Sequence, residues 1–120
     1  MSGKALRIKD YHFGSIKIDG ETYTNDVIIL PDRVVDNWWR DKGHVLQAED
    51  LDAVLTLEDK PQTLVVGQGA SGRMRVARDA REALEAAGIE LIAEPTEQAC
   101  ETYNALRDSE RVAAALHLTC

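Results

Sequence analysis

The residues that come closest to a ligand-binding motif are the glycines that follow a buried apolar run near the middle of the chain. The stretch Gly67-Gln68-Gly69-Ala70-Ser71-Gly72 has the spacing G-x-G-x-x-G and comes directly after Thr63-Leu64-Val65-Val66. In dinucleotide-binding folds such glycines let the backbone approach a pyrophosphate at a helix amino end, and an acidic residue about 20 positions further on binds the ribose. Glu90 and Glu94 lie in that region.

The place of this motif in the chain argues against a dinucleotide site. The motif normally opens the first unit of a larger doubly wound sheet, whereas 66 residues precede it here and 48 follow it. The next helical pattern also begins late, because Arg73 to Val76 separates it from the loop. These features favour the interpretation in which the glycines only shape a loop.

Four arginines beside this loop suggest an anionic ligand as an alternative. Cations near a helix amino end are unfavourable by a few tenths of a kcal/mol each, so their placement needs a reason. A solvated helix face paired with Asp79, Glu82 and Glu85 is the favoured explanation. The candidate residues for an anionic, possibly nucleotide, ligand are Gly67, Gly69, Gly72, Arg73, Arg75 and Arg78, with Arg81 one turn further on.

Histidines and cysteines raise the question of a metal site or a nucleophile. His117 and Cys120 lie three residues apart, and His12 and His44 are the other histidines. Zinc needs three or four convergent ligands, and residues three apart on a strand face opposite sides of a sheet. Ser71 lacks the glycine that a nucleophile elbow needs two residues later. We expect no metal, no cofactor and no catalytic residue.

Both tryptophans of the chain stand side by side. In an extended segment, one of Trp38 and Trp39 points inward and the other outward, and an exposed tryptophan is a frequent interface anchor. Packing of both rings against the amino-terminal hairpin is the alternative. The candidate interaction residues are Trp38, Trp39, Arg40 and His44.

Hydrophobic periodicity predicts the elements that must position these residues. Alternation in residues 14–18 and 21–24, around Asp19-Gly20, predicts a hairpin. Residues 33–44 fit neither period and are expected to be irregular or short-stranded. Buried strands are predicted at 27–30, 63–66 and 89–93, and helices from Glu49, around Ala80 to Ala87 with Gly88 after the end, and from Thr96 as N-cap.

The last apolar run, residues 112–118, fits either a helix or a strand, and we favour a strand. Strands that alternate with helices predict an α/β fold. We expect residues 1–120 to form a single layered domain, with a mixed, mostly parallel central sheet, flanking helices and an amino-terminal β-hairpin annex.

The net charge of the chain limits the kinds of molecule that it is expected to bind. The chain has 14 basic and 21 acidic side chains, a net charge of −7, and this disfavours nucleic acid as a partner. Residues 1–7 lack the apolar stretch of a secretory signal, and no run of 18 apolar residues predicts an integral membrane segment. The expected location is cytoplasmic.

Several short motifs together resemble the Mth-type domain family, a domain of unknown function that includes the mitochondrial complex I assembly factor 3 and the adipogenesis-associated Mth-domain-containing protein. The resemblance covers about residues 8 to 120. It rests on Tyr11-His12-Phe13-Gly14, Asp32-Arg33-Val34-Val35, Trp38-Trp39-Arg40, Gly43-His44, Glu49-Asp50-Leu51, Val66-Gly67-Gln68-Gly69, Tyr103-Asn104 and His117-Leu118-Thr119-Cys120.

The resemblance implies a single α/β domain with a final strand, and it supplies no catalytic residues. The mitochondrial members act as binding partners in assembling a respiratory complex. Since no Arg- and Ser-rich transit peptide is found, a prokaryotic or cytosolic relative is expected. We therefore expect a non-catalytic protein-interaction or assembly-factor-like domain with a protein partner. Binding of an anionic small molecule is the alternative, and enzymatic activity and oligomeric state stay open.

Overall fold

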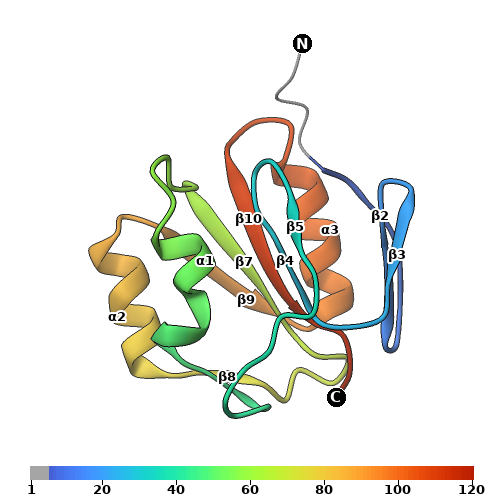
Figure 1. Cartoon of the computed structure of the whole chain (residues 1–120), viewed down its shortest axis with the longest axis horizontal. Coiled ribbons are helices and arrows are strands. Elements are labelled where there is room, and N and C mark those ends of the chain that lie inside the picture. The colour runs from blue at the N-terminus through green and yellow to red at the C-terminus, as the bar shows by residue number, and fades with distance from the viewer. Residues whose placement is uncertain (1–5) are drawn as a thin grey trace.

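The computed structural model describes residues 6–120 and builds them around a five-stranded sheet (Figure 1). The strands stand in the order β5 (Val34–Val35), β4 (Val27–Ile29), β10 (Val112–His117), β7 (Thr63–Gln68) and β9 (Glu90–Glu94). β10, β7 and β9 pair in parallel, whereas β4 is antiparallel to both β10 and β5. Four strands therefore run in one direction, which confirms the mixed, mostly parallel sheet and the final strand.

Helices cover both faces of this sheet, and this explains why its central strands are continuous apolar runs. One face carries the 3-10 helix η1 (Ala48–Leu51), α1 (Asp52–Leu55) and α2 (Arg78–Ala86), and the other carries α3 (Thr96–Leu106) (Figure 1). Along β7, Leu64 and Val66 pack with the first group and Val65 packs with α3. This alternation at period two divides the apolar core into two layers.

The amino-terminal annex is a three-stranded antiparallel sheet. The predicted hairpin consists of β2 (Ser15–Ile18) and β3 (Glu21–Tyr23), and β1 (Ile8–His12) adds a strand that periodicity did not reveal. The annex is fastened to α3 because the Asn104 amide donates to the Ile8 carbonyl at 2.7 Å and accepts from the Ile8 N–H at 3.0 Å.

Two very short strands organise the segments around the tryptophans and the glycine loop. β6 (Val45–Leu46) pairs in parallel with β8 (Arg75–Val76). Residues 33–44 are short-stranded or irregular, as expected, with only β5 in them. β8 also explains why α2 begins at Arg78, well after the loop.

One helix-boundary prediction is wrong and another is confirmed. Thr96 is not the N-cap of α3: Pro95 holds that position, and no side chain caps the helix. The Thr96 hydroxyl instead donates to the His117 carbonyl at 2.6 Å and accepts from the Gly69 N–H at 2.8 Å. Gly88 follows α2 with φ +76°, the left-handed conformation expected there.

Within residues 6–120, none of the helices has the length and apolar character that crossing a bilayer requires. The expectation that no secretory leader is present concerns residues 1–7, of which 1–5 lie outside the described residues.

Gly69 has a backbone conformation and a packing environment that exclude a side chain. Its φ is +98°, and an added Cβ would lie 2.5 Å from the Thr119 carbonyl oxygen. Gly69→Ala should lower the free energy of unfolding by about 3 kcal/mol, from backbone strain and this clash. Gly20→Ala is the matched control, because an added Cβ there meets nothing within 4 Å. Urea denaturation of both variants tests the prediction, and equal losses would contradict it.

Candidate functional site

The glycine loop is occupied by the protein's own backbone. The N–H groups of Ala70 and Ser71 donate to the carbonyls of Thr119 and Cys120 at 3.2 and 2.9 Å. The Gly72 N–H donates to the Gly69 carbonyl, and the Gly69 N–H is held by Thr96. None of these four N–H groups is therefore left for a phosphate, which supports the interpretation that the glycines shape a loop.

Close packing is a second reason for glycine in this loop. Gly67 is part of β7, and a Cβ there would lie 2.8 Å from the Thr96 hydroxyl oxygen and 2.9 Å from Leu116. Together with the clash at Gly69, this shows that two of the three motif glycines are needed where α3 and the chain after β10 approach β7.

The four arginines beside the loop are exposed, but the expected ion pairs are absent. Within residues 6–120, none of them lies within ion-pairing distance of Asp79, Glu82 or Glu85, so that part of the prediction is wrong. Asp79 instead accepts a hydrogen bond from the Ala48 N–H at 3.3 Å. An anionic ligand stays a prediction. The arginines, Arg73, Arg75, Arg78 and Arg81, are spread over the loop, β8 and α2.

The carboxylate of Asp26, just before β4, is the centre of a polar cluster. Its Oδ2 lies 2.8 Å from His117 Nδ1 and 2.9 Å from Arg40 Nη2, and its Oδ1 accepts from the Leu118 N–H at 2.8 Å. The side chains of Arg40 and His117 are only 4% and 7% exposed. We call Asp26, Arg40 and His117 the Asp26 cluster.

The environment of Asp26 keeps its carboxylate ionised. Burial by itself would raise the pKa of Asp26, but the hydrogen bonds from His117 and the Leu118 N–H and the charge of Arg40 outweigh it and lower the pKa. Because an ionised carboxylate only accepts, His117 must carry a hydrogen on Nδ1. Arg40 Nη2 comes within 3.0 Å of the same Nδ1 because both donors share Oδ2.

Arg40 links this cluster to the tryptophan pair. Its guanidinium lies 4.7 Å from the centre of a Trp38 ring, a cation–π contact, and donates to the Gly43 carbonyl at 2.9 Å. Trp38 is buried and donates from Nε1 to the Asp50 carbonyl, whereas Trp39 is 75% exposed. The inward and outward arrangement predicted for the pair is therefore confirmed. Its role in binding stays a prediction.

His44, His117 and Cys120 converge beside the Asp26 cluster. His44 Nε2 lies 3.0 Å from Cys120 Sγ, and one nitrogen of each imidazole and this sulfur all lie within 4.8 Å of one another. The expectation that His117 and Cys120 point apart is wrong because β10 ends at His117, so the strand alternation does not reach Cys120. Nothing local in the sequence brings His44 to this place.

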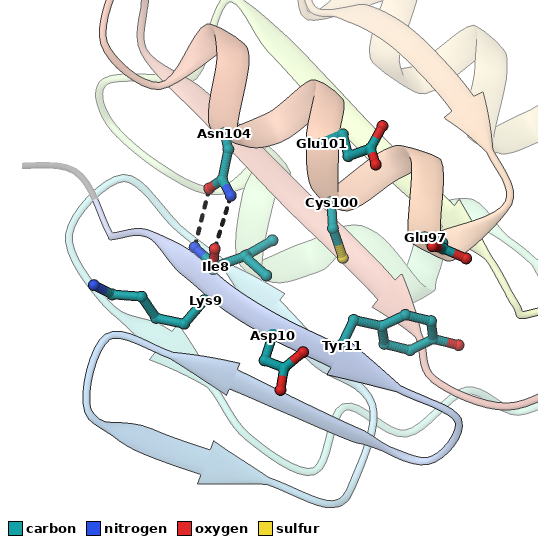
Figure 2. A pocket seen from close by; sticks show the side chains of 8 residues that line it. All are labelled: Ile8, Lys9, Asp10, Tyr11, Glu97, Cys100, Glu101 and Asn104. Atoms are coloured by element: carbon teal, nitrogen blue, oxygen red, sulfur yellow. Dashed lines mark hydrogen bonds between the residues drawn. The ribbon is translucent and has the colours of Figure 1, made fainter.

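A cleft of about 230 Å³ separates β1 from α3, and Figure 2 shows the side chains that line it, among them Cys100, Glu97 and Glu101. Burial, together with the charges of Glu101 and Glu97, raises the pKa of Cys100 to about 12. Its thiol is therefore protonated and poorly nucleophilic at neutral pH. Cys100 acts as a small core residue, as expected.

A family model described as "Protein of unknown function (DUF498/DUF598)" matches residues 8–117. A zebrafish (Danio rerio) protein, NADH dehydrogenase [ubiquinone] 1 alpha subcomplex assembly factor 3, is 30% identical over 109 residues, which are 90% of this chain. The chain spans 61% of the length of that relative.

Solved structures share the fold. A conserved hypothetical protein of Pyrococcus horikoshii OT3 is 28% identical, with a TM-score of 0.81 over 95% of this chain and 99% of its own. A Bordetella pertussis protein described as a Mth938-like domain is 19% identical, with a TM-score of 0.74 over 98% of this chain and 89% of its own. The similarity to the Bordetella pertussis protein concerns the fold alone.

Removing the central carboxylate should destabilise the protein strongly. Asp26→Ala leaves the Arg40 charge buried without its partner, so we expect the free energy of unfolding to fall by about 3 kcal/mol. Asp32→Ala removes a carboxylate from an exposed pair with Arg33 and should change it by less than about 0.5 kcal/mol. The two variants are compared by urea denaturation. Similar losses in both would show that the Asp26 cluster does not support the fold.

The two cysteines should differ in reactivity. With a pKa of about 12, only about one Cys100 thiol in 10⁴ is ionised at pH 8, and this fraction rises about tenfold for each pH unit up to 12. Iodoacetamide added to the native protein at pH 8 should modify the half-buried Cys120 and spare Cys100 until the chain unfolds. Mass spectrometry of the digested protein measures both sites, and equal labelling of the folded protein would refute the assignment.

Proposed function

The chain belongs to the DUF498/DUF598 family, in which the resemblance to Mth-type domains is confirmed, and from this premise we propose that it is a non-catalytic protein-binding domain that helps to assemble a larger protein complex. The zebrafish relative is named as an assembly factor. Two features that could have indicated an enzyme have structural roles instead: the glycine loop binds the chain after β10, and Cys100 lies in the core.

The observation that carries the proposal is the exposure of two large apolar side chains, Trp39 at 75% and Phe13 at 68%. Exposed aromatic residues are typical anchors of protein interfaces, where their burial supplies much of the binding energy. Two large aromatic side chains this exposed can bury most of their surface only against another molecule, and a protein surface that covers them is the partner we propose.

The two segments that contain Phe13 and Trp39 are both held by hydrogen bonds near the carboxyl end of β10. Phe13 lies in the turn between β1 and β2, where the Gly14 N–H donates to the Leu118 carbonyl at 2.9 Å. Trp39 follows Trp38, whose N–H donates to the Asp26 carbonyl at 2.8 Å. Since Asp26 also binds the Leu118 N–H, both segments meet at the carboxyl end of β10. An anchor held by rigid neighbours loses little conformational entropy on binding.

Trp39→Ala tests this proposal directly. Because the ring is mostly exposed, the melting temperature should change by less than about 2 °C. Recovery of the protein that co-purifies with the tagged chain from cells of its source should fall at least tenfold, as for a hot-spot residue. Lys60→Ala, an exposed change after α1, is the matched control and should leave recovery unchanged.

Site-specific photocrosslinking supplies the second measurement. A photoreactive phenylalanine analogue at position 39 or 13 should crosslink to the same protein, whereas the analogue at position 60 should not. Crosslinks to no protein from positions 39 and 13, or full recovery with Trp39→Ala, would overturn the proposal.

A further inference from the structure

We propose that His44, His117 and Cys120 bind a zinc ion at the carboxyl end of β10. This site lies at the same end of the sheet as the proposed protein-binding residues, but it does not depend on that function and stands on different observations. Two imidazoles and a thiolate suit zinc, a borderline-soft ion that takes histidine nitrogen and cysteine sulfur in tetrahedral geometry. Magnesium and calcium prefer oxygen ligands and are not expected to bind here.

The ring of His117 has one nitrogen that is not used by the Asp26 cluster. Its Nδ1 donates to the Asp26 carboxylate at 2.8 Å, so the neutral ring has its lone pair on Nε2. Nε2 is fully buried and has no hydrogen-bond partner among the described residues. A buried polar atom without a partner is unfavourable, and coordination to a metal would satisfy it.

The contact between His117 and Asp26 is one that metal sites use. A ligating histidine usually donates its other ring N–H to a carboxylate, which fixes the orientation of the ring and strengthens the ligand. Asp26 does this for His117, and Arg40 in turn holds Asp26. The buried ligand is therefore oriented before any metal binds.

The spacing of the three side chains is close to that of zinc ligands. Ligand atoms around tetrahedral zinc lie roughly 3.3 to 3.8 Å apart, given Zn–N and Zn–S lengths of about 2.0 and 2.3 Å. One nitrogen of each imidazole and Cys120 Sγ lie within 4.8 Å of one another, and His44 Nε2 and Cys120 Sγ are already 3.0 Å apart. His44 is exposed and Cys120 is half-buried, so both side chains have room to rotate towards a bound ion.

The charges around the site are compatible with a cation. Arg40 is the one positive side chain in the Asp26 cluster, and its charge is balanced by Asp26 at 2.9 Å. Zinc binds cysteine as the thiolate, so Cys120 adds a negative charge when the metal binds. The exposed His44 marks the side from which the ion enters, and water completes a fourth position, as in three-ligand zinc sites.

Cobalt(II) is a suitable spectroscopic probe, because it occupies zinc sites and reports thiolate coordination by a charge-transfer band. Titration of the purified, metal-free protein should give this band at one ion per chain, and added zinc should abolish it. His44→Ala should weaken zinc affinity at least tenfold, and Cys120→Ala should remove the band. His12→Ala is the matched control, since this exposed histidine lies on β1 beside Asp10, and it should bind like the unaltered protein.

Two further measurements distinguish loss of zinc binding from unfolding of the variants and from failure of the proposed protein-binding function. Far-ultraviolet circular dichroism should show that His44→Ala and Cys120→Ala remain folded, and zinc should protect Cys120 of the unaltered protein from iodoacetamide. Absence of the band, or equal zinc affinity in His44→Ala and His12→Ala, would overturn the metal site. Loss of crosslinking at position 39 with the band intact would overturn only the protein-binding function.

Discussion

The carboxylate of Asp26 is the interaction on which the end of the sheet depends. It accepts from His117, Arg40 and the Leu118 N–H, which come from β10, from the segment after β5 and from the chain beyond β10. Asp26 and Arg40 lie far from His117 and Leu118 in sequence, and a buried guanidinium is tolerated only with a matched anion. Without Asp26, Arg40 would lose its charge partner, and His117 would lose the contact that fixes its ring.

Close packing at this end of the sheet explains why the sequence around Gly67 resembles a phosphate-binding loop although the loop does not bind a phosphate through its backbone. A phosphate loop needs glycines because a ligand approaches the backbone closely. Here the close approach comes from Thr96 and from the backbone of Thr119 and Cys120. The steric requirement is the same, but the protein itself fills the space. This packing places Cys120 beside His44 and holds the chain after β10 against β7.

Local patterns in the sequence predict most of the fold, because burial on both faces makes β4, β7 and β10 continuous apolar runs. They miss β1, which has a bulge between Ile8 and Asp10 and mostly exposed side chains. They misassign Thr96, whose hydroxyl bonds to residues far away in sequence. The site was harder to predict: His44 and His117 are 73 positions apart, and only tertiary packing brings them together.

The proposed zinc site depends most on one atom, Nε2 of His117, which has a lone pair if the ring is neutral and Asp26 holds its hydrogen on Nδ1. Nitrogen-15 NMR of the imidazole rings, at neutral pH in the metal-free protein, distinguishes the two tautomers of a histidine through their different nitrogen shifts and couplings. We expect His117 to have its hydrogen on Nδ1 and a bare Nε2. A hydrogen on Nε2, either in the other tautomer or in an imidazolium, would contradict this expectation.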